Sequence, residues 1–444
     1  MKNIFRYMLT AAATACNSLF ALAQQPWSLE QCIDYAIEHN LTIKQQEANR
    51  EQSKIELNTA KWSRLPDLNG SASHSFNFGR SLQANNTYQS INTQSTGLNL
   101  STSVPLFTGL QIPNNIALSK LNLKAAIEDL NKAKEDISIQ VASAYLQVLF
   151  NEELSKVAHE QVSLSKEMLE QQAAYYKVGK ASESEWREAQ SRVAQDQLSA
   201  VQAENNYRLA LLDLSQLLEL PSPDDFSIVS PDIDGTGLIK ELTSPAEIYN
   251  QAVLTKPSIK AAQYRLEGAA HSIRIARSAY YPQLSFGAGL STNYYKMSGR
   301  DNAGFGSQLQ DNFSQYLGLS LSIPIFNRLS TRNRVRSARI QQTTLGWQLE
   351  ESKKTLYKEI QQAYYNAVSA ESQYHSSIAA DKAAEVSFNL MKEKYTNGKA
   401  SATQYNEART NWMKAVSDRI QAKYDYLFRT KILDFYKGVP LTLK

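Results

Sequence analysis

The chain has 444 residues, of which 20% are charged, and its formal net charge at pH 7 is +4. A charge so close to neutral gives no reason to expect nucleic acid as a partner. The length alone would allow two or three domains, and only two cysteines, Cys16 and Cys32, are present.

The first 23 residues have the pattern of a secretory signal peptide. Lys2 and Arg6 precede a mostly apolar stretch that ends in a small-x-small site at Ala23. Cleavage after Ala23 would lower the formal charge to +2 and leave Cys32 as the single cysteine, so no internal disulfide is expected. Cys32 lies at the start of an amphipathic helix and is predicted to be a small core residue.

Two alternatives apply to the same segment. Lipidation at Cys16 is disfavoured because Ala13 is a poor substitute for the leucine usual at that place, and because the apolar stretch continues to Ala23. A membrane anchor is weaker still, since Asn17 and Ser18 interrupt a stretch shorter than the roughly 20 apolar residues that a spanning helix needs. No later segment comes close to such a length.

The next segment, from Ser28 to Trp62, has helical spacing of its apolar residues. Ser28 and Gln31 form an S-x-x-Q capping box at its start, and Pro66 ends the helical pattern. The segment is the first helix of a predicted repeat that covers residues 24–230.

Four segments alternate between apolar and small polar residues, which predicts strands at about 66–79, 96–107, 282–296 and 313–326. Lysine, glutamate and aspartate are nearly absent from all four. One apolar face and one uncharged polar face are typical of transmembrane barrel strands, with lipid outside and water inside; the alternative is a small soluble sandwich. The apolar faces hold Leu68, Gly70, Ala72, His74, Phe76 and Phe78; Leu98, Leu100, Thr102, Val104 and Leu106; Leu284, Phe286, Ala288 and Leu290; and Leu317, Leu319, Leu321, Ile323 and Ile325.

The segments between these strands, Arg80 to Thr96 and Met297 to Asn312, are rich in Asn, Gln, Ser and Gly and are predicted to be loops. Only helices and closed barrels satisfy the backbone in lipid. Because four strands cannot close a barrel of useful bore, we expect several copies of the chain to close one ring.

Long helices are predicted after each strand pair. The stretch from Asn114 to about Lys177 has neither Pro nor Gly, and the stretch from Arg332 to Thr396 has only Gly346. Some 60 residues of helix would make a rod of about 90 Å. A second helix then returns toward Pro221 or Leu433, with seams suited to antiparallel coiled-coil packing.

The chain is internally duplicated. Y-K-V-G-K-A-S surrounds Gly179, and Y-T-N-G-K-A-S surrounds Gly398, which follows it by 219 residues. The same offset pairs S-V-P-L-F, ending at Phe107, with S-I-P-I-F, ending at Phe326. Such a period is too long for a solenoid. We therefore expect two repeats, 24–230 and 245–444, joined by a connector at 231–244.

Each repeated turn ends one long helix and begins the next. Glycine takes the left-handed C-terminal position without steric cost, and Ser182 or Ser401 can cap the returning helix. Two nearly identical turns at corresponding places indicate a surface presented to one partner. Its residues are Val178, Gly179, Lys180, Ser182, Asn397, Gly398, Lys399 and Ser401.

The whole chain after residue 23 resembles the TolC family of outer-membrane efflux and secretion channels. The resemblance rests on the duplicated order of helix, two strands and two helices, on the S-V-P-L-F and S-I-P-I-F strand ends, and on the two hairpin tips. It implies an α+β membrane protein that forms a homotrimer. Four strands from each protomer would make a twelve-stranded barrel in outer-membrane lipid, and coiled-coil helices would form a periplasmic tunnel.

The resemblance also implies partners. Members of the family dock their tips on a periplasmic adaptor (membrane-fusion) protein, which links them to an inner-membrane pump of the RND or ABC type. The chain would then be the passive exit duct of a tripartite efflux pump or a type I secretion system. The alternative is a periplasmic coiled-coil scaffold without a pore.

The family closes its pore at the tips, where acidic residues form rings. The matching positions here, six and nine residues after each glycine, are Glu185, Glu188, Gln404 and Glu407. Carboxylate rings at a narrow constriction favour cations and can raise each other's pKa. For each glutamate taken singly, the ordinary preference for acids at a helix N-terminus is an equally good explanation.

The family's tie that holds the tip closed is only partly retained. A tyrosine three residues before each glycine is present as Tyr176 and Tyr395, which are candidates for a gating tie. The arginine expected two residues after the second glycine is Ala400 here, with Lys399 one place away. The closing contacts of this chain must therefore differ.

No constellation for chemistry was found. The five histidines are scattered, and no metal-binding, phosphate-binding or nucleophile motif is complete. We expect no enzyme activity and no cofactor. A run of arginines after the last strand, at positions 328, 332, 334, 336 and 339, could contact lipid headgroups or peptidoglycan, but a solvated helix face is the simpler interpretation.

Overall fold

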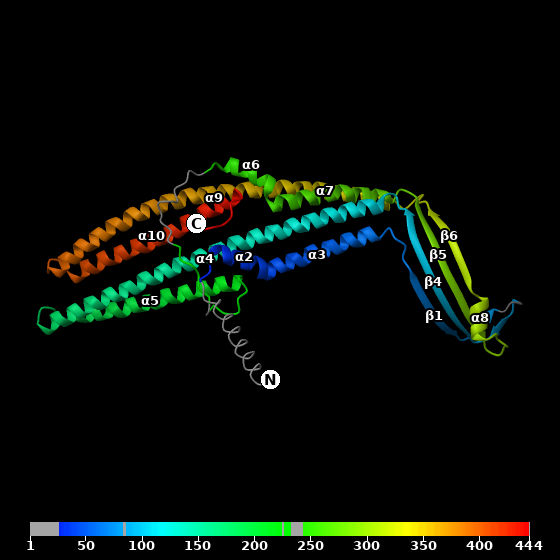
Figure 1. Cartoon of the computed structure of the whole chain (residues 1–444), viewed down its shortest axis with the longest axis horizontal. Coiled ribbons are helices and arrows are strands. Elements are labelled where there is room, and N and C mark those ends of the chain that lie inside the picture. Colours follow the sequence, from blue (N-terminus) through cyan, green and yellow to red (C-terminus); the bar gives the residue numbers. More distant parts are fainter. Residues whose placement is uncertain (1–25, 83–85, 224–225, 232–242, 444) are drawn as a thin grey trace, which may run out of the picture. The chain divides into compact units, whose positions relative to one another are not determined.

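The computed structural model describes residues 26–443 except 83–85, 224–225 and 232–242 (Figure 1). The predicted signal peptide, the alternative lipidation site Cys16 and most of the connector lie outside the described residues. The chain forms two compact units. The sheet unit comprises residues 48–128 and 260–350, and the tip unit comprises the described parts of 1–47, 129–259 and 351–444. Each unit combines segments from both halves of the chain.

The sheet unit contains one antiparallel sheet of four strands. These are β1 (Asn69–Asn77), β4 (Thr93–Phe107), β5 (Gln283–Met297) and β6 (Ser314–Ser322), in the order β1-β4-β5-β6. Its middle pairing, β4 with β5, joins the two halves of the chain. The four predicted strands are therefore confirmed, and their pairing is antiparallel.

The register of the sheet places the predicted apolar faces on one side. Gly70 lies opposite Leu100, and Leu100 lies opposite Leu290. Further along, Phe286 lies opposite Val104 on one side and Leu319 on the other. Because side chains alternate along a strand, these pairings align the four apolar rows. The opposite face carries the small polar rows.

Two predicted loops contain regular structure, and the last predicted strand ends earlier than expected. The segment 80–96 contains a short hairpin of β2 (Arg80–Leu82) and β3 (Tyr88–Ser90), and 297–312 contains helix α8 (Phe305–Asp311). Side chains stabilise the second segment, because Gln308 Nε2 donates to Tyr295 O at 3.0 Å. The outer strand β6 ends at Ser322, since β5, its one partner among the described strands, begins opposite it at Gln283.

The helical pattern predicted from Ser28 to Trp62 forms two helices, α2 (Leu29–His39) and α3 (Leu41–Trp62). They separate at Asn40, a buried residue whose Nδ2 donates to Leu217 O at 3.1 Å and whose Oδ1 accepts from Thr42 N at 2.9 Å. The second half repeats this break between α6 (Pro245–Thr255) and α7 (Pro257–Ser278). There Pro257 disfavours helical backbone at Lys256.

The remaining helices are long. α4 (Gln111–Lys177) and α9 (Ser330–Thr396) have 67 residues each, and α5 (Glu183–Leu217) and α10 (Ala402–Tyr436) have 35 each. At about 1.5 Å per residue, 67 residues make a rod of roughly 100 Å. Among the described residues, no helix combines the length and the apolar character needed to cross a membrane.

The tip unit has the larger core. Cys32 is fully buried in it, as predicted, and burial raises the pKa of its thiol to about 12. The hydroxyl of buried Tyr145 donates to Val229 O at 2.6 Å and contacts Trp27 O at 3.1 Å. Trp27 and Ile228 form a parallel bridge at the same place. These contacts hold the start of the first repeat against its end.

Candidate functional site: the helical hairpin tips

Each tip is a helix hairpin closed by a left-handed glycine. Gly179 has φ +73° and Gly398 has φ +69°. The following amides complete the turn, because Lys180 N donates to Tyr175 O at 2.9 Å and Lys399 N donates to Lys394 O at 2.8 Å. No side-chain crowding requires these glycines, since a Cβ at either would meet nothing within 4 Å. The backbone conformation alone favours glycine there.

Both returning helices begin with a complete capping box. Glu185 N donates to Ser182 Oγ at 3.2 Å, and Ser182 N donates to Glu185 Oε2 at 2.7 Å. At the second tip, Gln404 N donates to Ser401 Oγ at 3.3 Å, and Ser401 N donates to Gln404 Oε1 at 3.0 Å. Glu185 and Gln404 therefore do the same structural work, which a neutral amide performs as well as a carboxylate.

The bonds from Ser182 lower the pKa of Glu185, first through its backbone amide and then through its hydroxyl. Within the described protomer this shift is opposite to the rise that a ring of carboxylates would cause. Glu185 is exposed, so little burial opposes its ionisation, and local hydrogen bonds stabilise its charge.

The predicted aperture residues are brought together only in part. Glu185 and Glu188 help to line a small cavity of about 40 Å³ between the two hairpins. Glu188 Oε1 also accepts from Asn406 Nδ2 of the other hairpin at 3.2 Å. Gln404 and Glu407 do not line this cavity, and both are exposed.

The two candidate gating tyrosines have different surroundings. The ring of Tyr176 stacks on Trp186 of its own hairpin, with centroids 5.4 Å apart. Tyr395 contacts both hairpins, because its hydroxyl accepts from Gln172 Nε2 at 2.9 Å while its ring stacks on Tyr405. Burial, followed by the charges of Glu185 and Glu188, raises the pKa of Tyr395. Of the two, only Tyr395 joins the hairpins.

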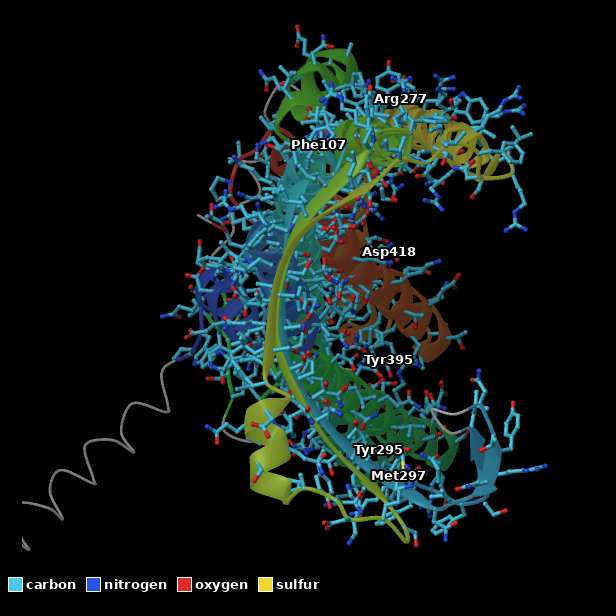
Figure 2. All side chains as sticks on the ribbon, turned by 90° about the vertical axis from the view of Figure 1, so that its right-hand side faces the viewer. Phe107, Arg277, Tyr295, Met297, Tyr395 and Asp418 are labelled. Carbon is cyan, nitrogen blue, oxygen red and sulfur yellow. The ribbon has the colours of Figure 1, made fainter. Side chains whose placement is uncertain are left out.

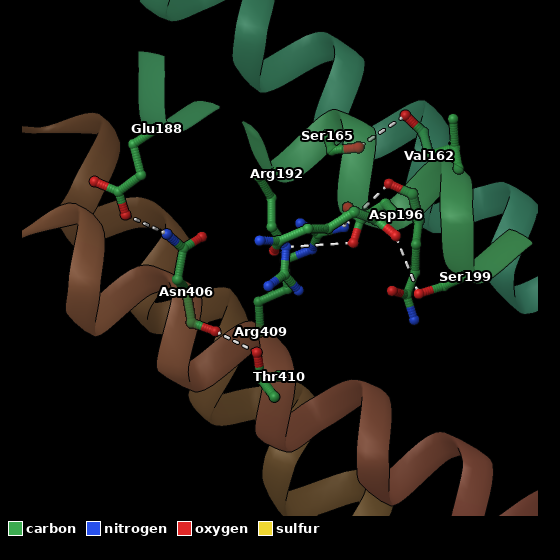
Figure 3. Close-up of polar contacts among 11 residues, drawn as sticks. Val162, Ser165, Glu188, Arg192, Asp196, Ser199, Asn406, Arg409 and Thr410 are labelled. Atoms are coloured by element: carbon green, nitrogen blue, oxygen red, sulfur yellow. Dashed lines mark hydrogen bonds and ion pairs between the residues drawn. The ribbon is translucent and has the colours of Figure 1, made fainter. Parts of the chain in front are cut away.

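The strongest tie between the hairpins was not predicted from the sequence. Arg409 of α10 is only 1% exposed, and its guanidinium bonds Asp196 Oδ2 of α5 at 2.6 Å (Figure 3). The same nitrogen donates to Gln161 O of α4 at 3.0 Å. Arg192 Nε lies 3.3 Å from the other carboxylate oxygen of Asp196. Arg409 thus joins the second hairpin to both helices of the first.

This cluster holds two guanidinium groups around one carboxylate. The Nε atoms of Arg192 and Arg409 and the hydroxyl of Tyr405 are buried without a hydrogen-bond partner among the described residues. Asp196 is the carboxylate that pairs with both guanidinium groups, so its removal would leave the buried charge of Arg409 without its ion-pair partner. The arrangement fixes how the two hairpins pack more than it adds net stability.

A sequence signal for the cluster exists. Asp196 lies between Val193 and Ala200 on the buried row of α5, and Arg409 lies four residues after Tyr405 on the buried row of α10. Opposite charges on two apolar helix rows favour a pair. The pairing itself needs the fold, because the partners are 213 residues apart.

The chain matches the family model described as outer membrane efflux protein over residues 32–219 and 248–436. It therefore belongs to the outer membrane efflux protein family, as the resemblance to the TolC family predicted. Its location is the outer membrane.

Two curated relatives illustrate the match. The chain is 24% identical to the cation efflux system protein CusC of Escherichia coli O157:H7, over 78% of this chain and 73% of that protein. It is 23% identical to the outer membrane protein TolC of Escherichia coli K12, over 96% of this chain and 84% of that protein.

Solved structures share the fold. The outer membrane channel CmeC of Campylobacter jejuni superimposes with a TM-score of 0.75 at 22% identity, covering 92% of this chain and 85% of that chain. The outer membrane protein VceC of Vibrio cholerae gives 0.74 at 16% identity, covering 93% and 96%. The family is one of transport channels.

Proposed function

We propose that three copies of this chain form the passive exit duct of a tripartite efflux pump or a type I secretion system. The observation that carries the proposal is the combination of an uncharged sheet, apolar on one face, with two long helix hairpins that end in the same turn. No residues for energy conversion were found in the sequence, so an inner-membrane pump of the RND or ABC type would supply the driving force.

The edges of the sheet support closure by several copies. In the described part of the chain, β1 and β6 are each paired on one side only. An open edge in lipid would leave backbone groups without partners. Pairing of β6 of one protomer with β1 of the next would satisfy both edges in a heterologous ring. Three protomers would give twelve strands.

The two faces of the sheet fit this arrangement. On the apolar face, Leu317 is 79% and Leu319 is 68% exposed in the protomer, which suits contact with membrane lipid. The other face carries small polar residues that suit a water-filled lumen. They include Asn99, Ser101, Ser103, Ser285, Gly287, Ser320 and Ser322.

The tips are proposed to dock on a periplasmic adaptor. Val178 at the first tip is 67% exposed in the protomer, so its apolar side chain is available to a partner. The other proposed docking residues are Gly179, Lys180, Ser182, Asn397, Gly398, Lys399 and Ser401. The tips differ beside these turns, since Trp186 stacks on Tyr176 whereas the corresponding Tyr405 is buried against Tyr395. The adaptor would therefore meet two kinds of site.

The aperture is proposed to be formed by Glu185, Glu188, Gln404 and Glu407, with Tyr176 and Tyr395 as candidate ties. Among these, Glu407 is the best candidate for a ring of carboxylates. It is exposed, and it forms no ion pair with the described residues. Glu185 and Glu188 already accept hydrogen bonds from Ser182 and Asn406.

We also propose that the chain arose by duplication, with repeats 24–230 and 245–444 and a connector at 231–244. Corresponding helices have equal lengths. Helices α2 and α6 have 11 residues each, and α3 and α7 have 22 each. The long pairs, α4 with α9 and α5 with α10, are equal as well.

Membrane fractionation tests the proposed function. The protein should sediment with the outer membrane, resist extraction by salt, and migrate on a gel as a trimer that becomes a monomer on heating. A soluble monomer in the periplasmic fraction would contradict the proposal and favour the scaffold without a pore.

A further inference from the structure

The start of α9 carries a cluster of cations that form no ion pair with the described residues. This arginine cluster consists of Arg328, Arg332, Arg334, Arg336 and Arg339, of which 332, 336 and 339 share one face of α9 and 334 lies on another. All five side chains are exposed, and none is in an ion pair with the residues that the structure describes. No aspartate or glutamate occurs between Asp311 and Glu350. The cluster is therefore open to an external anion.

The cluster is placed against the preference of its own helix. The N-terminus of a helix carries a partial positive charge that favours acidic residues and disfavours cations. The first turn of α9 has no acidic residue, and Arg332 lies within that turn. The stability of the helix alone does not account for this choice of residues.

Arg328 also has an unfavourable backbone conformation. It has φ +54°, and the next residue, Leu329, has φ +61°. The corresponding turn of the first repeat has Gly109 with φ +62° and Leu110 with φ +66°. Glycine adopts this conformation without strain, whereas arginine does not. The second repeat thus keeps a strained arginine where its duplicate has the unstrained residue.

The cluster lies at the helix-bearing end of the sheet. The strand ends that join helices meet there, because Phe107 pairs with Leu284 and Gln283 pairs with Ser322. Figure 2 labels Phe107 and Arg277 at this end and Tyr295 and Met297 at the opposite end. The ends of α3 and α7 contribute further exposed cations: Arg64, Arg274 and Arg277.

Exposed aromatic residues lie near the same end of the sheet. The group comprises Trp62 at 63%, Tyr280 at 53%, Tyr281 at 54% and Phe326 at 78% exposure. Along the chain after β6, Ile325 is 94% exposed, Phe326 follows, and Arg328 comes two residues later. Apolar, aromatic and cationic side chains in this order match the hydrocarbon, the interface and the phosphate level of a lipid leaflet.

We propose that the arginine cluster binds the phosphates of phospholipid headgroups in the leaflet at the helix-bearing end of the sheet. This inference rests on the proposed function, in which the sheet lies in lipid. Guanidinium groups bind phosphate oxygens in a bidentate way, and several of them together favour an anionic lipid surface. The cluster fixes the depth at which the barrel sits.

The test uses the purified full chain in detergent, titrated with phosphatidylglycerol while thermal unfolding is followed by circular dichroism. A phosphate-free galactolipid and inorganic phosphate are the comparison ligands. The test variant is R332Q/R334Q/R336Q/R339Q. The matched control, K354Q/K358Q/K382Q/K392Q, removes four exposed cations from later turns of the same helix.

Phosphatidylglycerol should raise the unfolding midpoint of the wild type and of the control, and 0.5 M salt should weaken that rise. The test variant should lose most of the rise in unfolding midpoint. Its apparent lipid affinity should fall on the order of fivefold for each arginine removed. An equal rise in the test variant would overturn the proposal, as would equal stabilisation by the galactolipid or by inorganic phosphate. Retention on peptidoglycan sacculi that depends on the cluster, with an unchanged lipid response, would assign it to that polymer instead.

The single variant R328G separates a lipid role from a structural one. Without lipid it should unfold at the same or a higher temperature than the wild type, because the strain is relieved. It should nevertheless respond more weakly to phosphatidylglycerol. A variant that is less stable without lipid and equally responsive would contradict the proposal. Channel recordings in planar bilayers test the proposed function separately, since a chain that conducts can still lack the lipid response.

Discussion

Arg409 holds α10 to both helices of the first hairpin by charge rather than by apolar contact. Its partners are Asp196 Oδ2 at 2.6 Å and Gln161 O at 3.0 Å, and the side chain is almost fully buried. A buried ion pair adds little net stability compared with apolar residues of the same volume, but breaking one is costly. The tie therefore fixes the register of the hairpins at the tip.

The group of Arg192, Asp196 and Arg409 predicts that two substitutions differ in how much stability they cost. Asp196→Asn leaves the buried guanidinium of Arg409 and the partly exposed guanidinium of Arg192 without this carboxylate, and should lower the free energy of unfolding by about 3–5 kcal/mol. Arg409→Met leaves Asp196 paired with Arg192 and should cost less. Denaturant unfolding of the full chain measures both, with hydrogen exchange at the tips to locate the effect.

Arg419→Met is the matched control for this prediction. Arg419 pairs with Asp381 at 2.7 Å, but its side chain is 32% exposed and the pair lies within one hairpin. Its loss should cost at most about 1 kcal/mol. The asymmetry would be refuted if Arg409→Met proved more damaging than Asp196→Asn.

The two capping boxes should respond differently to acid. The folded pKa of Glu185 is lowered by bonds from Ser182, so its contribution is present at neutral pH and is lost as the pH falls below the usual range of a glutamate. Gln404 does not titrate. The protection of the Ser182 amide, measured relative to its intrinsic exchange rate at each pH, should therefore fall in acid, while the protection of the Ser401 amide should not acquire this dependence. Glu185→Gln should abolish the difference, and a persisting difference would contradict the assigned cause.

At the scale of elements, replacing a turn glycine by alanine should lower stability, whereas replacing a helix glycine by alanine should raise it. Gly398→Ala places a Cβ at φ +69° and should destabilise the tip by about 1–2 kcal/mol. Gly346→Ala lies inside α9 with open space around it and should stabilise the helix by about 1 kcal/mol. Thermal unfolding measures both, and a neutral Gly398→Ala would mean that the turn relaxes.

Periodicity predicted the elements well where one pattern governs a segment. The alternating rows around Leu100 and Phe286 indicated strands, and the absence of Pro and Gly after Asn114 indicated a long helix. The break at Asn40 could not be predicted, because the helical pattern continues through it and its cause is a contact with Leu217. Helix α8 was missed because its polar composition resembles a loop.

For a similar reason, the sequence predicted some contacts of the candidate site and missed others. The glycine turns and serine caps depend on neighbours within a few residues, so the sequence carries them. The Arg409–Asp196 pair depends on the packing of two hairpins that are distant in sequence. The roles of Glu407 and Tyr176 at an aperture remain predictions, because they require neighbouring protomers.

At the scale of the whole molecule, the two halves share one sheet through β4 and β5, and each compact unit takes segments from both halves. The proposed duplication would therefore have produced one intertwined protomer rather than two domains in series. Its sheet still has two open edges among the described strands. The proposed trimer follows from the need to pair them.

The central claim, that copies of this chain form a conducting duct, is tested most directly by planar-bilayer recording of the purified protein. We expect discrete, cation-selective conductance that is lost when the trimer is dissociated by heat. Glu407→Ala should reduce cation selectivity, while Glu183→Ala, which removes a carboxylate already paired with Arg187 in the same tip, should have little effect. A wild-type protein that never conducts in bilayers would contradict the account.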